Sequence, residues 1–233
     1  MTQSIIQLHA GTFTNAFLVQ GEAGRLLVDT GPPGAEGRLL AALAAQGVDP
    51  ESLALILITH GHTDHYGSAA ALREHTGAPL AMHALDADAA RQGINQPDSI
   101  RPANALGRLY LRLGFLRNWA SPDYAPAFEP DVIFSEGMDL APYGVAGQAL
   151  HTPGHTPGSS AVLLDGGPAI IGDMVMGSFR SALRRPGPGL AFAWDLELNR
   201  QSLRRLLAQA PQRLYVGHGG PFSPEAVRAV VEL

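Results

Sequence analysis

The stretch 59–65, THGHTDH, concentrates residue types that bind metal ions. It holds three histidines and one aspartate, although the whole chain has only nine histidines. Because it follows the apolar run 53–58, it is predicted to lie on a turn that leaves a strand and enters a helix, where side chains are well placed for chemistry. Four such groups would repel one another when protonated and would be costly to bury unpaired, and a cation resolves both problems. The candidate metal ligands of this stretch are His60, His62, Asp64 and His65.

Three further ligand-type residues follow predicted strands or turns downstream. His155 lies in TPGHTPGS, Asp173 ends the run AIIGD, and His218 lies in LYVGHGG. Each would be unremarkable alone, because loop histidines and capping aspartates are common. Together with the first cluster they complete a set large enough for two metal ions. The remaining histidines are His9, His75 and His83, the last two predicted not to bind metal, and His151, a candidate support of the site.

The composition excludes several kinds of chemistry. The chain has no cysteine, so disulfides, cysteine-ligated zinc and thiol nucleophiles are excluded, and any metal must be held by His, Asp or Glu. Its basic residues are all arginines, so lysine chemistry is excluded too. A net charge of −5 and scattered arginines disfavour nucleic-acid binding. The sequence shows neither a leader-like N-terminus nor an apolar run of the ~20 residues that span a membrane, so we expect a cytoplasmic protein that does not bind membranes.

Apolar runs separated by glycine and proline predict strands in both halves of the chain, with helices between them. This order fits an α+β fold with two sheets sandwiched between helices better than a doubly wound parallel sheet. The length favours one domain over residues 1–233. The predicted strands are 5–8, 15–19, 26–28, 53–58, 80–82, 132–134, 145–150, 160–164, 169–171 and 214–216. The predicted helices are 35–46, 66–75, 84–91, 196–208 and 224–231.

The segment 93–130 interrupts this pattern. It is rich in proline yet contains the apolar and aromatic string NALGRLYLRLGFLRNW, which predicts a helical insertion. The insertion is either a connecting element or a lid that lines a substrate pocket, and the sequence leaves both open. As a lid it would place Tyr110 and Trp119 against the substrate.

The string His60-x-His62-x-Asp64-His65, followed by His155, Asp173 and His218, resembles the metallo-β-lactamase-fold hydrolase superfamily over essentially the whole chain. The sequence VDTGPP around Asp29 is also similar to an early strand-end motif of that family. The resemblance implies a four-layer αββα sandwich with the site at the sheet edges. It further implies that His60, His62 and His155 hold a first metal ion, that Asp64, His65 and His218 hold a second, that Asp173 bridges them, and that Asp29 supports the site from behind.

Departures from family patterns narrow the function. Lactamases with a cysteine ligand are excluded, because this chain has no cysteine. Lactamases with the all-histidine pattern differ from this chain, because they lack a bridging aspartate at the position of Asp173. Flavodiiron-type relatives differ as well, because they have a glutamate at the position of His62. Glyoxalase II-like thioesterases share every ligand, although the helical glutathione-binding domain that normally follows His218 is expected to be absent. Lactonases share the ligands as well. The alternatives left open are a mononuclear-iron enzyme similar to persulfide dioxygenases, a phosphodiesterase or β-lactamase of the same fold, and a non-catalytic metal-binding module.

The ligand types suit Zn²⁺, and manganese or iron would also be accepted. We expect two ions per chain, sharing a hydroxide that attacks the carbonyl of a thioester, ester or lactone. Asp64 and Asp173 are the predicted catalytic residues, Asp64 by orienting the water or carrying its proton and Asp173 by bridging the ions. Arg180, in the glycine- and proline-rich GSFRSALRRPGPG, is a candidate for binding a substrate carboxylate or phosphate. The expected partner is a small-molecule substrate, and a homodimer is left open.

Overall fold

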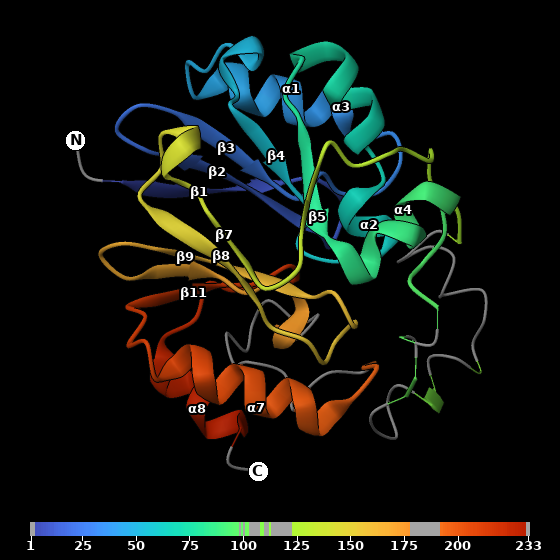
Figure 1. Cartoon of the computed structure of the whole chain (residues 1–233), viewed down its shortest axis with the longest axis vertical. Coiled ribbons are helices and arrows are strands. Elements are labelled where there is room, and N and C mark those ends of the chain that lie inside the picture. Colours follow the sequence, from blue (N-terminus) through green and yellow to red (C-terminus); the bar gives the residue numbers. More distant parts are fainter. Residues whose placement is uncertain are drawn as a thin grey trace.

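The structure is a computed structural model that describes residues 3–97, 99, 101–102, 108–109, 112, 123–177 and 192–231. Within these residues two β-sheets lie face to face, and helices cover the outer face of each sheet (Figure 1). The four layers follow the order α, β, β, α. This is the α+β sandwich that the sequence predicts.

The first sheet has six strands in the order β1-β2-β3-β4-β5-β6 within the described residues. Their bounds are Ser4–His9, Asn15–Gln20, Arg25–Val28, Leu55–Leu57, Leu80–His83 and Val132–Phe134. Strands β1 to β3 pair antiparallel, and β3 to β6 pair parallel. The parallel strands β3, β4 and β5 are almost continuously apolar, as strands buried on both faces must be.

The second sheet has five described strands in the order β11-β10-β9-β8-β7. Their bounds in chain order are Gly137–Asp139, Gly147–His151, Ser160–Leu164, Pro168–Ile170 and Arg213–Tyr215. Strands β7 to β10 pair antiparallel, whereas β10 and β11 pair parallel.

Helices α1 and α3 lie on the outer face of the first sheet, and α7 and α8 lie on the outer face of the second (Figure 1). Helices α2 and α4 lie near one end of the sandwich, beside β5. The helices are α1 Glu36–Ala45, α2 Thr63–Tyr66, α3 Ala69–Thr76, α4 Ala87–Gln92, α7 Leu196–Leu207 and α8 Pro224–Val231. Short 3-10 turns span Pro50–Ser52, Ala84–Asp86, Ala141–Tyr143 and Gly172–Met174. Among the residues described, no helix is both long and apolar enough to cross a membrane.

Three apolar cores hold the four layers together. Strand β4 shows the alternation that builds them, because Ile56 packs toward α1 and α3 whereas Leu55 and Leu57 pack between the two sheets. A third core lies under α7 and includes Leu203 and Val216. Since apolar burial contributes about 25 cal/mol per Å², these three cores fix the two sheets against each other and so fix the loops at their edges.

Most predicted elements are present, with three corrections, and the helical insertion predicted over 93–130 lies largely outside the described residues. The helix predicted over 84–91 begins instead with the 3-10 turn Ala84–Asp86, and α4 follows it. The helix predicted over 66–75 is two helices, α2 and α3, separated at Gly67 and Ser68. A Cβ at Gly67 would lie 2.4 Å from Pro33, so the chain passes too close to this proline for an ordinary helical residue. Strand β7 was not predicted, because its three residues are mostly exposed and show no apolar pattern.

Candidate metal centre

The seven predicted ligands come from four segments that meet at one edge of the two sheets. The segment after β4 carries four of them, and the segments after β8, β10 and β11 carry one each. The ligand atoms form overlapping groups whose members lie within 4.8 Å of one another. These groups are His60, His62 and His155, then His60, His65 and Asp173, and finally Asp64, His65 and His218. All seven side chains are buried, so the structure brings together every residue of the predicted set.

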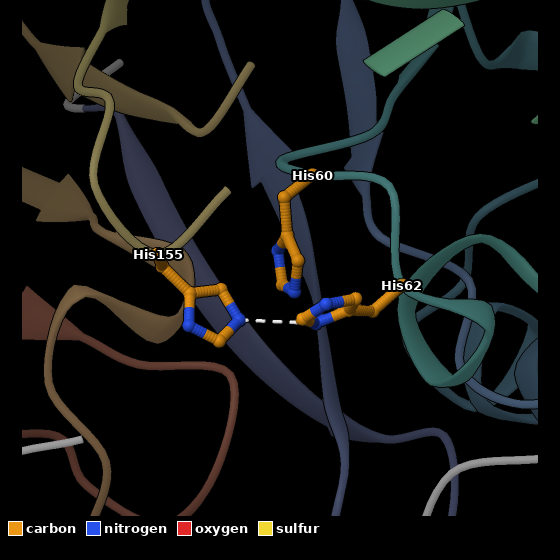
Figure 2. A group of neighbouring side chains, drawn as sticks. All are labelled: His60, His62 and His155. Atoms are coloured by element: carbon orange, nitrogen blue, oxygen red, sulfur yellow. Dashed lines mark hydrogen bonds between the residues drawn. The ribbon is translucent and has the colours of Figure 1, made fainter. Parts of the chain in front are cut away.

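His60, His62 and His155, which we call the three-histidine group, point their rings toward one another (Figure 2). His60 and His62 come from one loop and His155 from the facing loop of the second sheet. The His155 Nε2 atom lies 3.0 Å from the His62 Nδ1 atom. Ring centroids in this group are 4.7 to 4.8 Å apart.

Asp64, His65 and His218 form a second group, which we call the mixed group. The His65 and His218 Nε2 atoms are 3.3 Å apart. Asp173 Oδ2 lies 3.2 Å from His218 Nε2 and 3.8 Å from His155 Nε2, so this carboxylate reaches both groups. The bridging role that the family resemblance implies for Asp173 stays a prediction.

The outward nitrogens of the three-histidine group each have a partner that fixes the ring proton. His155 Nδ1 lies 3.2 Å from the Phe192 carbonyl, which can only accept, so the proton is on Nδ1. The Ser99 hydroxyl donates to the Gln96 carbonyl and therefore accepts from His62 Nε2, at 2.8 Å. The Thr59 hydroxyl donates to Asp29 and therefore accepts from His60 Nδ1, so the ring proton of His60 is on Nδ1.

The same arrangement holds in the mixed group. His65 Nδ1 donates to the Asp29 carboxylate at 2.8 Å, and His218 Nδ1 donates to the Phe13 carbonyl at 2.9 Å. Each of the five histidines is thus held by its outer nitrogen while the other nitrogen faces the centre. Such outer partners orient the rings of metal-binding histidines and set their tautomers.

Two buried atoms at the centre have no hydrogen-bond partner among the described residues. They are Nε2 of His60 and Oδ1 of Asp173. A buried acceptor left unpaired costs roughly 1–3 kcal/mol. Two inward nitrogens that both carry lone pairs, on His62 and His155, also face each other at 3.0 Å. A divalent cation would satisfy all of these acceptors, so the donor set fits a metal ion.

The two groups differ in their electrostatics. Burial lowers the pKa of His62 to about 3, and burial also lowers the pKa of His60 and of His155. The three-histidine group is therefore neutral at physiological pH, as a metal ligand must be.

The mixed group behaves in the opposite way. Burial opposes the charge of His218, yet the nearby Asp173 carboxylate raises its pKa to about 10. Burial likewise opposes a charge on His65, but Asp173 and Asp29 raise its pKa well above its usual value. The pKa of Asp64 falls to about 2 because its attraction to His65 and His218 outweighs its burial. A cation in this group would replace protons held by the histidines.

The other predicted site residues are placed as follows. Asp29 lies behind the centre and accepts hydrogen bonds from the Thr59 amide, the Thr59 hydroxyl and His65. His151 donates its Nε2 proton to the Pro157 carbonyl in the loop after His155, and so supports that loop. His9, His75 and His83 belong to none of the ligand groups. The substrate-binding candidates Tyr110, Trp119 and Arg180 lie outside the described residues.

Two supporting residues were not predicted from the sequence. Ser99 belongs to the 93–130 insertion and accepts a hydrogen bond from His62. The insertion therefore contacts the loop that carries His60 and His62. The backbone N–H of Gln96 also donates to the Gly61 carbonyl, at 2.7 Å. Asp86 is the other missed residue, a fully buried aspartate between the ligand loops. Neither stands in a pattern that distinguishes it from ordinary polar residues.

Comparisons with known proteins agree with this geometry. The family model of the metallo-beta-lactamase superfamily matches residues 9–218. The chain therefore belongs to the metallo-beta-lactamase superfamily, and its broad class is that of the metal-dependent hydrolases.

Two similar proteins match about half of the chain each. It is 36% identical over 137 residues to metallo-beta-lactamase domain-containing protein 1 of Mus musculus, which is 59% of this chain and 49% of that protein. It is 34% identical over 108 residues to the hydroxyacylglutathione hydrolase GloC of Haemophilus influenzae, 46% of this chain and 42% of that protein. The matched part therefore spans half or less of the length of these two relatives. A solved metallo-beta-lactamase family protein from Thermus thermophilus is 26% identical, with a TM-score of 0.67, over 99% of this chain and 77% of that one.

Proposed function

We propose that this protein is a dinuclear zinc hydrolase that cleaves a small-molecule thioester or lactone. The observation that carries the proposal is the convergence of five histidine nitrogens and two carboxylates on one buried centre. Each histidine is held by an outer partner, and the central acceptors His60 Nε2 and Asp173 Oδ1 have no protein partner among the described residues. A structural zinc site needs only four closed ligands, so seven exceed what a purely structural role requires.

The three-histidine group would hold one ion and the mixed group the other, with Asp173 shared between them. When bound, the ions would supply Lewis acidity toward a substrate carbonyl and a water of lowered pKa. Histidine and carboxylate ligands without cysteine suit zinc, while manganese and iron remain compatible with the same donors.

Asp64 and Asp173 would carry the acid–base work of the chain itself. Both carboxyl groups have a lowered pKa, because the attraction to the neighbouring histidines outweighs burial. They are therefore ionised at neutral pH and accept hydrogen bonds. Asp64 would orient the attacking water and take up its proton, whereas Asp173 would keep the two groups at a fixed separation.

The substrate class rests on two supports. The bridging Asp173 is part of the ligand set that the resemblance shares with glyoxalase II-like thioesterases and lactonases. The similarity to a relative named as a hydroxyacylglutathione hydrolase points to the same thioester chemistry. Tyr110, Trp119 and Arg180 remain our candidates for contacting the substrate, on their sequence context alone.

The test combines metal analysis with a substrate panel. Protein purified without added metal is analysed for zinc, manganese and iron, and is assayed with thioesters, lactones, phosphodiesters and, by oxygen uptake, a glutathione persulfide. We expect about two metal equivalents and turnover of a thioester or lactone. Asp173→Asn should lose at least one equivalent and most activity, whereas His75→Gln, an exposed change on α3, should match the wild type.

Three results would contradict the proposal. A single iron with oxygen uptake on the persulfide would assign an oxygenase instead. Turnover confined to phosphodiesters would keep the metal centre and replace the substrate class. Bound metal without turnover of any substrate in the panel would assign a non-catalytic metal-binding module.

A further inference from the structure

Asp86 is a fully buried aspartate that belongs to none of the metal-ligand groups. It follows β5 on the 3-10 turn Ala84–Asp86 and lies between the two loops that carry the three-histidine group. Its Oδ2 atom accepts from the Gly61 amide at 2.7 Å and from the Thr156 hydroxyl at 2.6 Å. Its Oδ1 atom accepts from the Gly158 amide at 2.8 Å. One carboxylate thus bonds both ligand loops at once.

The bonded residues are the immediate neighbours of the ligands. Gly61 separates His60 from His62, and Thr156 follows His155. Any change in the position of Asp86 therefore acts on all three members of the group through one intervening residue.

The packing around Asp86 leaves little room for adjustment. A Cβ at Gly158 would lie 2.6 Å from the Asp86 Cγ atom, and a Cβ at Gly61 would lie 3.2 Å from the Asp86 Cβ atom. Gly158 is therefore needed for its loop to approach the carboxylate this closely, and a side chain at Gly61 would be a tight fit. The loop after His155 is also held internally, because the Thr156 amide donates to the Ser159 hydroxyl.

We propose that Asp86 is a positioning residue that sets the distance between the loop of His60 and His62 and the loop of His155, and thereby the metal affinity of the three-histidine group. Residues in that group come from different sheets, so no short-range chain geometry fixes their separation. A carboxylate is the side chain suited to this place, because it accepts hydrogen bonds from several donors without offering one. The inference rests on the proposed metal centre and adds a residue that controls one half of it.

The key variant is Asp86→Asn, which keeps the size of the side chain. In either orientation of the amide, its NH₂ group would face the amide N–H of Gly61 or of Gly158 and leave that donor without an acceptor. Supporting partners of metal ligands typically change metal affinity about 10–100-fold when removed. We expect a loss of that size at the three-histidine group and a change of less than about threefold at the mixed group.

Zinc affinities are measured in two steps by competition with a chromophoric chelator. Nitrogen NMR spectra of the histidine rings assign each step, through the signals of His62 and His155 on one side and of His65 and His218 on the other. Thr156→Val, which removes one of the three bonds, should give an intermediate loss, and Thr156→Ser should restore wild-type affinity. These two variants also carry the test if Asp86→Asn does not fold.

Asp131→Asn is the matched control. Asp131 accepts from the Leu80 amide at 2.9 Å, at the start of β5, whereas Asp86 follows the end of the same strand. Asp131→Asn should leave the zinc affinities of both ligand groups within about threefold of the wild type, even if its melting temperature falls as far as that of Asp86→Asn.

The outcomes separate this inference from the proposed function. Wild-type protein that binds no metal would overturn both. Wild-type protein with two ions, beside an Asp86→Asn protein with unchanged affinities, would overturn the role of Asp86 alone. An equal loss at both groups, or a loss that Asp131→Asn reproduces, would show that Asp86 merely stabilises the fold.

Discussion

Gly217 offers the sharpest mutational test of the metal centre, because it lies directly against two proposed ligands. A Cβ added at this position would lie 2.3 Å from Asp173 Oδ1 and 2.5 Å from His65 Cε1. Ordinary van der Waals contact begins at about 3.4 Å, so one of the partners must move by about 1 Å. The backbone of Gly217 cannot yield easily, since its N–H donates to the Gly172 carbonyl and its carbonyl accepts from the backbone N–H of Asn15.

Gly217→Ala should therefore damage the centre more than the fold. Overpacking of a buried site typically costs about 1–3 kcal/mol, which a chain of this size tolerates in many cases. Asp173 reaches both ligand groups, so its displacement should weaken both zinc-binding steps, and we expect at least about a tenfold loss in each. Turnover should fall in proportion to the metal lost.

The assay is a zinc titration by chelator competition, with urea denaturation of the metal-free protein run beside it. Gly37→Ala is the control, because Gly37 lies in α1 and an added Cβ there meets nothing within 4 Å. That variant should bind zinc like the wild type and gain up to about 1 kcal/mol in stability. Normal zinc affinity in Gly217→Ala, with a correctly folded chain, would refute the placement of Asp173 and His65 as ligands.

Three further predictions follow from the supports and charges of the centre. Asp29→Asn puts an amide where His65 finds its acceptor, so zinc affinity should fall about 10–100-fold in chelator competition, and an unchanged affinity would show that His65 is oriented by other contacts. Ser99→Ala frees the tautomer of His62 and should weaken zinc binding by about tenfold, whereas Ser99→Thr should restore it; equal behaviour of the two variants would contradict the tautomer argument. Burial lowers the pKa of His218, but the neighbouring carboxylates outweigh it and raise the pKa from 6.5 to about 10. Between pH 6.5 and 10 the folded, metal-free protein therefore keeps a proton on His218 that the unfolded chain has lost. The stabilisation from His218 is complete below pH 6.5 and is lost as the pH rises toward 10, so urea midpoints of metal-free protein should fall over that range; a flat profile would mean that His218 is neutral in the fold.

The candidate ligands could be predicted from the sequence because each lies in a short, recognisable local pattern. The cluster 59–65 follows an apolar strand, and His155, Asp173 and His218 each stand at the end of another predicted element. The strands could be predicted for the same reason. A strand buried on one face shows alternating apolar residues, and a strand buried on both faces shows a continuous apolar run.

The supporting contacts of Asp86 and Ser99 were not predictable, because each joins residues far apart in the chain. Asp86 stands 70 residues before Thr156 in sequence, and Ser99 stands 37 residues after His62. In the string ALDADAA, Asp86 looks like any polar position of an amphipathic helix. The structure instead breaks that predicted helix at Asp86, with a 3-10 turn before α4, and buries the carboxylate. Only tertiary packing distinguishes it from its exposed neighbour Asp88.

The asymmetry between the two ligand groups follows from where the carboxylates lie. Burial and mutual repulsion keep the three-histidine group neutral, so an ion entering it displaces no proton. Asp173 and Asp64 instead hold protons on the histidines of the mixed group, and an ion must compete with those protons. The Asp173 carboxylate interacts electrostatically with both groups, because its Oδ2 atom lies within 4 Å of Nε2 of His155 and of Nε2 of His218. A cation in the three-histidine group would therefore weaken the hold of Asp173 on the His218 proton.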